Sequence, residues 1–166
     1  MVKKTSNAQV VLLLRILDEG FNKSAWHGPN MRGAIRRVDA EQACWRPGPG
    51  RKSIADNTVH AAYWKYAARR RLTGEKRGSF PLKGSNWLTL EEPLSVATWK
   101  TYVKIADDAH KGLREVAAEL SDRDLMRVTK GAKIDIRRLL FGIALHDVYH
   151  AGQIQLLKRL YASRET

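Results

Sequence analysis

Cysteine is almost absent from this sequence, because Cys44 is its only occurrence in 166 residues. A single thiol excludes a disulfide within the chain and is typical of proteins from a reducing compartment. Cys44 lies beside Trp45, where we expect a small packing residue rather than a reactive nucleophile.

Long apolar runs are also missing. The apolar stretch after the basic N-terminal residues, Val10 to Leu14, ends at Arg15 and is too short for a membrane span or for the core of a signal peptide. We therefore expect a cytoplasmic protein with no membrane partner. A glycine-rich phosphate loop, a paired-cysteine zinc motif and a serine nucleophile elbow are likewise missing.

Negative charge is scarce, with 17 acidic against 30 basic residues and a net charge of +13. Basic proteins attract nucleic acid, anionic membranes and anionic small molecules. Part of the excess gathers at the end of one predicted helix and in the loop after it, at Lys65, Arg69, Arg70, Arg71, Lys76, Arg77 and Lys83. This basic cluster has three possible interpretations: a solvated surface without a specific partner, the rim of a site that attracts an anionic substrate, or a surface that binds nucleic acid.

Apolar periodicity predicts four long helices, over residues 5–20, 53–72, 93–120 and 136–162. Ser53 and Asp56 form a capping motif at the start of the second helix, and Gly74 follows its end. Pro29 suits the first turn of a short helix that continues to Val38. We predict an all-α fold, a four-helix bundle with an additional short helix and long connecting loops, in a single domain over residues 1–166.

The segment 75–92 is predicted to be irregular, because glycine, proline and asparagine interrupt it. We expect Trp87 to hold this segment against the bundle. A loop of this length in a compact domain often covers a functional site.

The last helix places polar residues where its buried stripe should be apolar. The stripe is spaced by alternating steps of four and three residues and comprises Leu139, Ile143, His146, His150, Gln153, Leu157 and Leu160. Buried polar groups without partners cost about 1–3 kcal/mol each. His146 and His150 lie one turn apart on one face, so a bound metal ion is the leading explanation.

A third ligand is needed for a metal site that performs chemistry, and His60 on the second long helix is the best candidate. Asp56, one turn earlier, is either a fourth ligand or the residue that orients His60. Tyr63 and Trp64, one turn later, are expected to line the pocket. Gln153 either bonds a ligand or a metal-bound water, or ties two helices together.

The two remaining histidines and the residues beside His146 and His150 are not expected to bind the metal. His27 is expected to help start the short helix, and His110 is expected to face solvent. Asp147 and Tyr149 flank the histidines in sequence and are expected to point away from them.

These motifs resemble the DinB superfamily, the DinB/YfiT-like proteins. The resemblance covers nearly the whole chain and rests on four segments: Ser53-Ile54-Ala55-Asp56 followed by His60; His146-Asp147-Val148-Tyr149-His150-Ala151-Gly152-Gln153-Ile154; Trp26-His27-Gly28-Pro29; and Trp45-Arg46-Pro47-Gly48-Pro49-Gly50. It implies a four-helix bundle, often a homodimer, with a divalent metal, commonly zinc or nickel. By position, the implied metal ligands are His60, His146 and His150.

Three functions are compatible with these features. The resemblance favours a metal-dependent S-transferase that joins a low-molecular-weight thiol to a small-molecule substrate. An anionic substrate is one of the interpretations that the basic cluster allows. A metal-dependent hydrolase with a metal-bound water is the first alternative, with Asp56 as a candidate base. A non-enzymatic bundle that binds nucleic acid is the second, although no recognition helix is visible.

Overall fold

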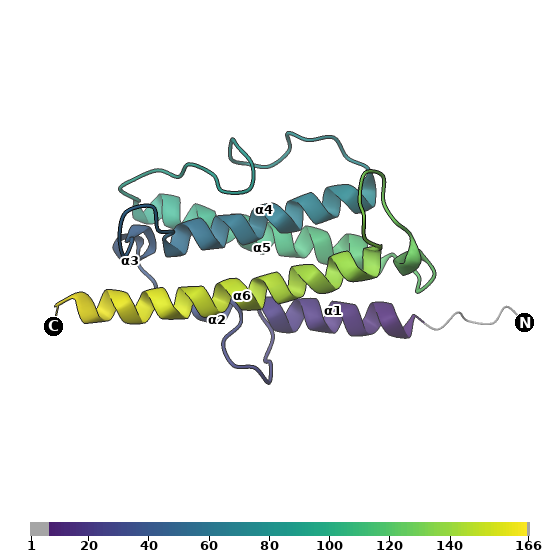
Figure 1. Cartoon of the computed structure of the whole chain (residues 1–166), viewed down its shortest axis with the longest axis horizontal. Helices are drawn as coiled ribbons and strands as arrows, with labels where there is room; N and C mark the ends of the chain where they lie inside the picture. The colour runs from purple at the N-terminus through teal and green to yellow at the C-terminus, as the bar shows by residue number, and fades with distance from the viewer. Residues whose placement is uncertain (1–6, 166) are drawn as a thin grey trace, which may run out of the picture.

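The computed structural model describes residues 7–165, and within them the protein is entirely helical apart from loops and turns (Figure 1). The described residues contain no β-strand, and the only extended pairing recorded there is an isolated bridge between Val128 and Asp135. The α-helices are α1 (Ala8–Phe21), α2 (Met31–Ala34), α3 (Ala40–Cys44), α4 (Ile54–Thr73), α5 (Val96–Ala118) and α6 (Ile136–Ala162). Two 3-10 turns, η1 (Asp124–Met126) and η2 (Ser163–Glu165), complete the secondary structure.

The predicted start of α4 is confirmed, because Ser53 and Asp56 cap it reciprocally. The Ser53 hydroxyl accepts a hydrogen bond from the backbone N–H of Asp56, and the Asp56 carboxylate accepts one from the backbone N–H of Ser53. Gly74 ends the helix in the left-handed conformation, with φ of 77°. Asp135 caps α6, whose bounds agree with the prediction.

The bounds predicted for α1, α2 and α5 are corrected. Helix α1 begins at Ala8 rather than at residue 5, and residues 5 and 6 of the predicted helix lie outside the described residues. The short helix α2 starts at Met31 and is capped by Asn30, so Pro29 lies outside the helix, and α2 is shorter than predicted. Helix α5 begins at Val96 because Ser95, rather than Pro93, is its N-cap. Helix α3 was not predicted from the sequence at all.

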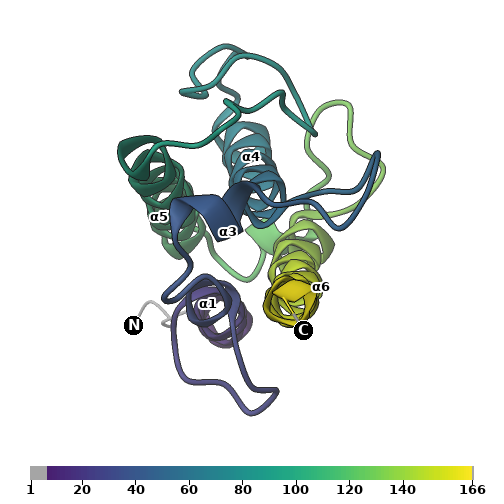
Figure 2. The ribbon, with the colours of Figure 1, turned by 90° about the vertical axis from the view of Figure 1, so that its left-hand side faces the viewer.

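The four long helices form the predicted bundle (Figure 2). Helix α4 packs against α5 and α6, and α1 packs against the same two helices from the opposite side. Helices α4 and α5 run in one direction, whereas α1 and α6 run together in the other (Figure 1). Residues 75–95 return the chain along the full length of α4, which makes α4 and α5 parallel neighbours. The topology therefore differs from a simple up-down-up-down bundle.

The apolar core is divided into two clusters. One contains the first halves of α4 and α5 and the second half of α6, and the other contains most of α1, the first half of α6 and the last turns of α5. Between them, on four helices, lie the buried or half-buried polar side chains of Asp18, Lys65, His110 and Asp147. We call this set the central polar layer.

The predicted stripe on α6 is buried or half-buried except at its end, with His146 and Gln153 half-buried. Leu139, Ile143, His150 and Leu157 are buried, but Leu160 is 41% exposed. Leu160 lies near the end of α6, beyond the part of the helix that contributes to the core clusters. No helix within residues 7–165 is long and apolar enough to cross a membrane.

Candidate metal centre

The three predicted histidines meet at one point between α4 and α6. Nε2 of His146 lies 3.2 Å from Nε2 of His60 and 3.0 Å from Nε2 of His150. The candidate ligand atoms of all three residues lie within 4.8 Å of one another. His60 and His150 are buried, and His146 is half-buried. Residues 86 positions apart in the chain thus form a single group.

Hydrogen bonds assign the protonated nitrogen on two of these rings. Nδ1 of His60 lies 3.1 Å from the backbone carbonyl of Asn86, which can only accept a hydrogen bond. Nδ1 of His150 lies 2.7 Å from Oδ1 of Asn57. The Asn57 amide group itself donates through Nδ2 to the Ser53 carbonyl at 2.7 Å, so Oδ1 is the atom that faces the ring. Both imidazoles therefore donate from Nδ1 and keep a lone pair on Nε2.

A cation is the partner that suits three such nitrogens. A proton on Nε2 of His146 can point at only one of its two neighbours, which leaves lone pairs facing each other in a buried space. Two nitrogens at about 2.0–2.1 Å from a tetrahedral zinc ion lie about 3.3 Å apart, close to the separations found here. Metal-binding histidines also typically donate their other N–H to a carbonyl or carboxylate, as His60 and His150 do.

Burial keeps the three imidazoles neutral. It is the main cause that lowers the pKa of His146 to about 3 and that of His150 to about 4, and repulsion from the neighbouring imidazoles adds to both shifts. Burial also lowers the pKa of His60, with a further contribution from the positive charge of Lys52. Neutral imidazole is the form that binds metals, so the rings are prepared to act as ligands near neutral pH.

The stability of the metal-free protein is expected to fall as the pH is lowered from about 6.5 towards 4. Below pH 6.5 a histidine in the unfolded chain is protonated, whereas His146 in the folded protein stays neutral down to about pH 3. The unfolded state therefore binds more protons, and lowering the pH stabilises it relative to the folded state. Urea unfolding midpoints measured between pH 7 and pH 5 should decrease more steeply for the wild type than for His146→Ala. Asp147, whose pKa burial raises to about 6, acts in the opposite direction but is present in both proteins. Equal slopes would contradict the expectation.

Comparison with known proteins agrees with this geometry. A family model described as the DinB superfamily matches residues 25–154. The chain belongs to the DinB superfamily. No curated protein and no solved structure matches the chain. The matched segment contains all three histidines, and their nitrogen donors fit the metal that DinB membership implies.

The loop between α4 and α5 covers His60, and the predicted role of Trp87 is confirmed. The Trp87 ring stacks on His60 with centroids 3.8 Å apart and planes 6° apart. Lys52 places its Nζ 4.9 Å from the centre of the Trp87 ring. Asn86 accepts a hydrogen bond from Trp64 through its side chain and one from His60 through its carbonyl. The loop of this DinB protein is thus attached to the candidate metal centre at two adjacent residues.

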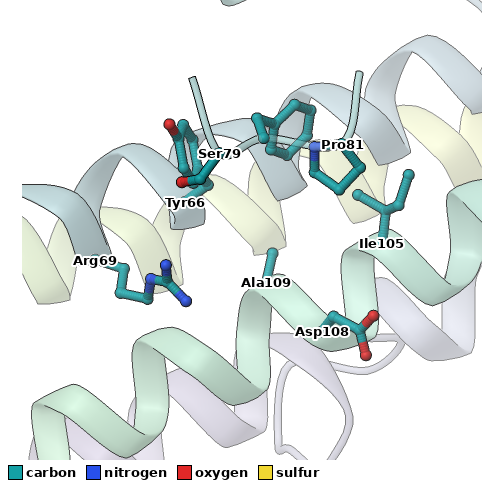
Figure 3. Close-up of a pocket in the computed structure, with 8 residues that line it drawn as sticks. Tyr66, Arg69, Ser79, Pro81, Ile105, Asp108 and Ala109 are labelled. Carbon is teal, nitrogen blue, oxygen red and sulfur yellow. The ribbon is translucent and has the colours of Figure 1, made fainter. Parts of the chain in front are cut away.

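Tyr63 and Trp64 differ in their relation to the histidines. Trp64 contacts the His60 ring edge-on, with centroids 6.4 Å apart, and its role as a pocket residue stays a prediction. Tyr63 instead packs against Phe80 and Tyr66. Those two residues line a separate cavity of about 180 Å³ between α4, α5 and the loop (Figure 3). The predicted place of Tyr63 beside the metal is therefore not what the structure shows.

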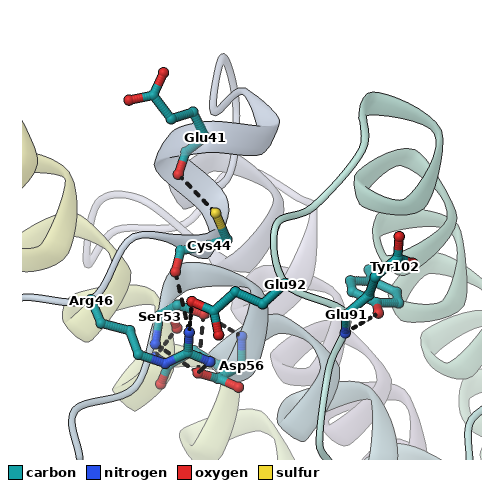
Figure 4. Close-up of polar contacts among 9 residues, drawn as sticks. Glu41, Cys44, Arg46, Ser53, Asp56, Glu91, Glu92 and Tyr102 are labelled. Atoms are coloured by element: carbon teal, nitrogen blue, oxygen red, sulfur yellow. Dashed lines mark hydrogen bonds and ion pairs between the residues drawn. The ribbon is translucent and has the colours of Figure 1, made fainter. Parts of the chain in front are cut away.

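Asp56 has a different role from either of those predicted. Its carboxylate accepts hydrogen bonds from the Ser53 backbone and hydroxyl, and it pairs with Arg46 at 3.0 Å (Figure 4). Arg46 also reaches Glu92, which ties residues 44–46 to the end of the long loop. The partner that orients His60 is the Asn86 carbonyl rather than Asp56. Arg46 accounts for the difference, because it neutralises a buried carboxylate that the capping motif already holds.

Gln153 lies one turn after His150 and is half-buried. Its Oε1 is buried and makes no hydrogen bond of good geometry within the described residues, although the Gln153 amide lies close enough to His150 to raise the pKa of that imidazole. This atom does not tie two helices together. The other predicted role, a hydrogen bond to a ligand or to a metal-bound water, stays a prediction.

Two predicted surface residues belong to the central polar layer. Lys65 is only 1% exposed and pairs with Asp147, so it is not part of the surface basic cluster. His110 is 4% exposed rather than solvent-facing, because it stacks on Phe21 and lies 3.2 Å from Asp18. Asp147 points away from the histidines as expected, but its burial was not predicted. Neither pairing is visible in sequence, since each partner lies on another helix.

His27 is exposed in the loop before α2, and its predicted role at a helix start is wrong. Asn30 provides the cap instead.

Replacing Asn57 with alanine is expected to weaken metal binding by about 10- to 100-fold, because His150 loses the acceptor that holds its ring. Competition with a chelating dye measures the affinity. Thr58→Ala is a matched control: Thr58 is also buried on α4, but the hydrogen bond of its hydroxyl goes to the Ile54 carbonyl rather than to a histidine. Equal loss of affinity in both variants would contradict the role of Asn57.

Proposed function

We propose that this DinB protein is an enzyme that binds a divalent metal ion, zinc or nickel, through Nε2 of His60, His146 and His150. The convergence of these three nitrogens, two of them with assigned lone pairs, carries the proposal. Family membership and the three-histidine group are both compatible with a metal-dependent enzyme.

The proposed reaction is the transfer of a small thiol to an electrophilic substrate. A divalent ion held by His60, His146 and His150 would lower the pKa of a thiol bound to it, so that the thiol would lose its proton and attack the electrophile as a thiolate. The protein's own residues support this chemistry. Asn57 and the Asn86 carbonyl orient two ligands, Trp87 shields one face of His60 from water, and Lys52 adds a positive charge that favours an anionic sulfur.

Hydrolysis of an ester or amide is the less favoured alternative. It requires a general base near the reacting water, and Asp56 was the candidate. Its carboxylate is occupied by Ser53 and Arg46, so it is poorly placed to accept a proton.

The test is a conjugation assay on the zinc-loaded protein. Glutathione, cysteine and coenzyme A are each supplied with monobromobimane, and the rate is compared with the spontaneous reaction. We expect a rate above background with at least one thiol, and background alone for His146→Ala. If zinc is bound and every thiol reacts only at background, S-transfer is overturned. Cleavage of p-nitrophenyl acetate without thiol would then favour hydrolysis.

We also propose that the protein is a homodimer, joined through the outer faces of α1 and the first half of α6. Leu12, Phe141, Leu145 and Tyr149 are exposed there, and a groove of about 570 Å³ lies between the two helices. An exposed apolar face of this kind is typical of an interface between proteins. Leu145→Asp is expected to convert the dimer into a monomer, as measured by light scattering. Lys100→Asp, at an exposed position of α5, should leave the dimer intact. A monomeric wild type would contradict the proposal.

A further inference from the structure

A cavity of about 360 Å³ is lined by two residues that contact the histidines, Asn57 and Trp87. It lies between the loop that precedes α4 and the second half of α6. Its inner end is formed by Asn57 and Trp87, which contact His150 and His60 respectively, and by Gln153. This volume lies within the range that small-molecule sites occupy.

The cavity has an uncompensated positive charge. Arg51 and Lys52 line it, and neither forms an ion pair with any described residue. No aspartate or glutamate is among its lining residues. The cavity of Figure 3 provides a contrast, because its Arg69 pairs with Glu75 and Asp108 also lines it. An anion would therefore gain more from the cavity beside the histidines.

The outer end of the same cavity is apolar. Leu156 and Leu160 line it and are exposed, and Leu157 continues the apolar surface towards the core. The cavity thus combines apolar contacts, two cations and the buried acceptor Oε1 of Gln153, which makes no hydrogen bond of good geometry within the described residues. A few polar groups on a largely apolar wall are what orient a small ligand.

We propose that this cavity is the substrate pocket and that its ligand is a small organic anion with an apolar segment. The anionic group lies against Arg51 and Lys52, and the apolar segment lies against Leu156 and Leu160. The inference rests on the proposed function, because the pocket serves the metal centre that it adjoins. It adds the chemical class of the substrate.

The experiment uses octanoate as the probe, titrated into the zinc-loaded full chain by calorimetry. Acetate provides the anion without the apolar segment, and 1-octanol provides the segment without the anion. We expect octanoate to bind about tenfold more tightly than either, since exposed ion pairs contribute up to about 1 kcal/mol each. Octanoate that binds no more tightly than 1-octanol would overturn the proposal.

Charge variants locate the site. Arg51→Gln/Lys52→Gln is expected to weaken octanoate binding about tenfold while leaving 1-octanol unchanged. Lys100→Gln/Lys104→Gln removes the same charge from α5 and should have no effect. Leu156→Asn should weaken octanoate and leave acetate unchanged. Unaltered octanoate binding in the Arg51/Lys52 variant overturns the proposal.

Zinc content is measured on the same samples, which separates the two proposals. Zinc-loaded protein that fails to bind octanoate overturns the pocket and leaves the metal centre standing. Protein that takes up neither zinc nor nickel overturns the metal centre. The pocket is then decided on the metal-free protein, by titrating octanoate into the wild type and into Arg51→Gln/Lys52→Gln and comparing the two affinities.

Discussion

Replacing His146 with alanine is expected to reduce the metal content from about one ion per chain to nearly none. Nε2 of His146 lies between those of His60 and His150, so its loss leaves two ligands and no closed donor set. Loss of a residue that only hydrogen-bonds a metal ligand weakens metal binding about 10- to 100-fold. Loss of the ligand His146 itself should weaken it more. Elemental analysis after dialysis against metal-free buffer measures the content.

His27→Ala is the matched control, because His27 is an exposed histidine outside the three-residue group. This variant should retain the metal content of the wild type. His60→Ala tests the ligand from α4 separately, and it should behave like His146→Ala. Undiminished metal in His60→Ala would remove that residue from the site, and undiminished metal in both would remove the site.

Replacing Asp147 with alanine is expected to lower the free energy of unfolding by about 3–5 kcal/mol. Asp147 pairs with Lys65 in the central polar layer, and the two side chains are each about 1% exposed. Burial raises the pKa of Asp147 and lowers that of Lys65, and the charge of each partner opposes the shift of the other. Without Asp147, Lys65 keeps a buried charge or gives up its proton, and either change is unfavourable. Urea unfolding at pH 7 measures the loss.

Two controls test whether the loss of stability comes from leaving the buried charge of Lys65 without its partner. Asp108→Ala breaks the exposed pair with Lys104 on α5 and should cost less than about 1 kcal/mol. Lys65→Met/Asp147→Leu removes both charges and should recover most of the stability lost in Asp147→Ala, because apolar side chains of similar size can replace a buried pair. If the double variant is as unstable as Asp147→Ala, the charge pair is not the cause.

The helices could be predicted because their signals are local. The apolar stripe of α6 and the capping pair Ser53–Asp56 depend on residues within a few turns of one another, and both agree with the structure. The start of a helix depends on which of several nearby side chains caps it. A cap contributes only about 1 kcal/mol, so the sequence did not distinguish the candidates for α2, α3 and α5.

The candidate metal centre was predictable for a related reason. Polar residues on an apolar stripe are conspicuous, so His146 and His150 stood out, and His60 followed from its place on a capped helix. Their partners Asn57 and Asn86 gave no comparable signal. An asparagine on a helix or in a loop is ordinary until another element brings a histidine to it.

The sequence by itself determined the helical class, the bounds of α4 and α6 and the histidines that form the centre, because periodicity, capping and ligand chemistry depend on residues close together in the chain. Only the tertiary structure decided how charged groups are paired. It buried Lys65 against Asp147, directed Asp56 to Arg46, stacked His110 on Phe21 and left Arg51 and Lys52 unpaired beside the histidines. The physical reason is that burial and Coulomb energy depend on distances between elements, and residues far apart in sequence acquire those distances only when the bundle closes.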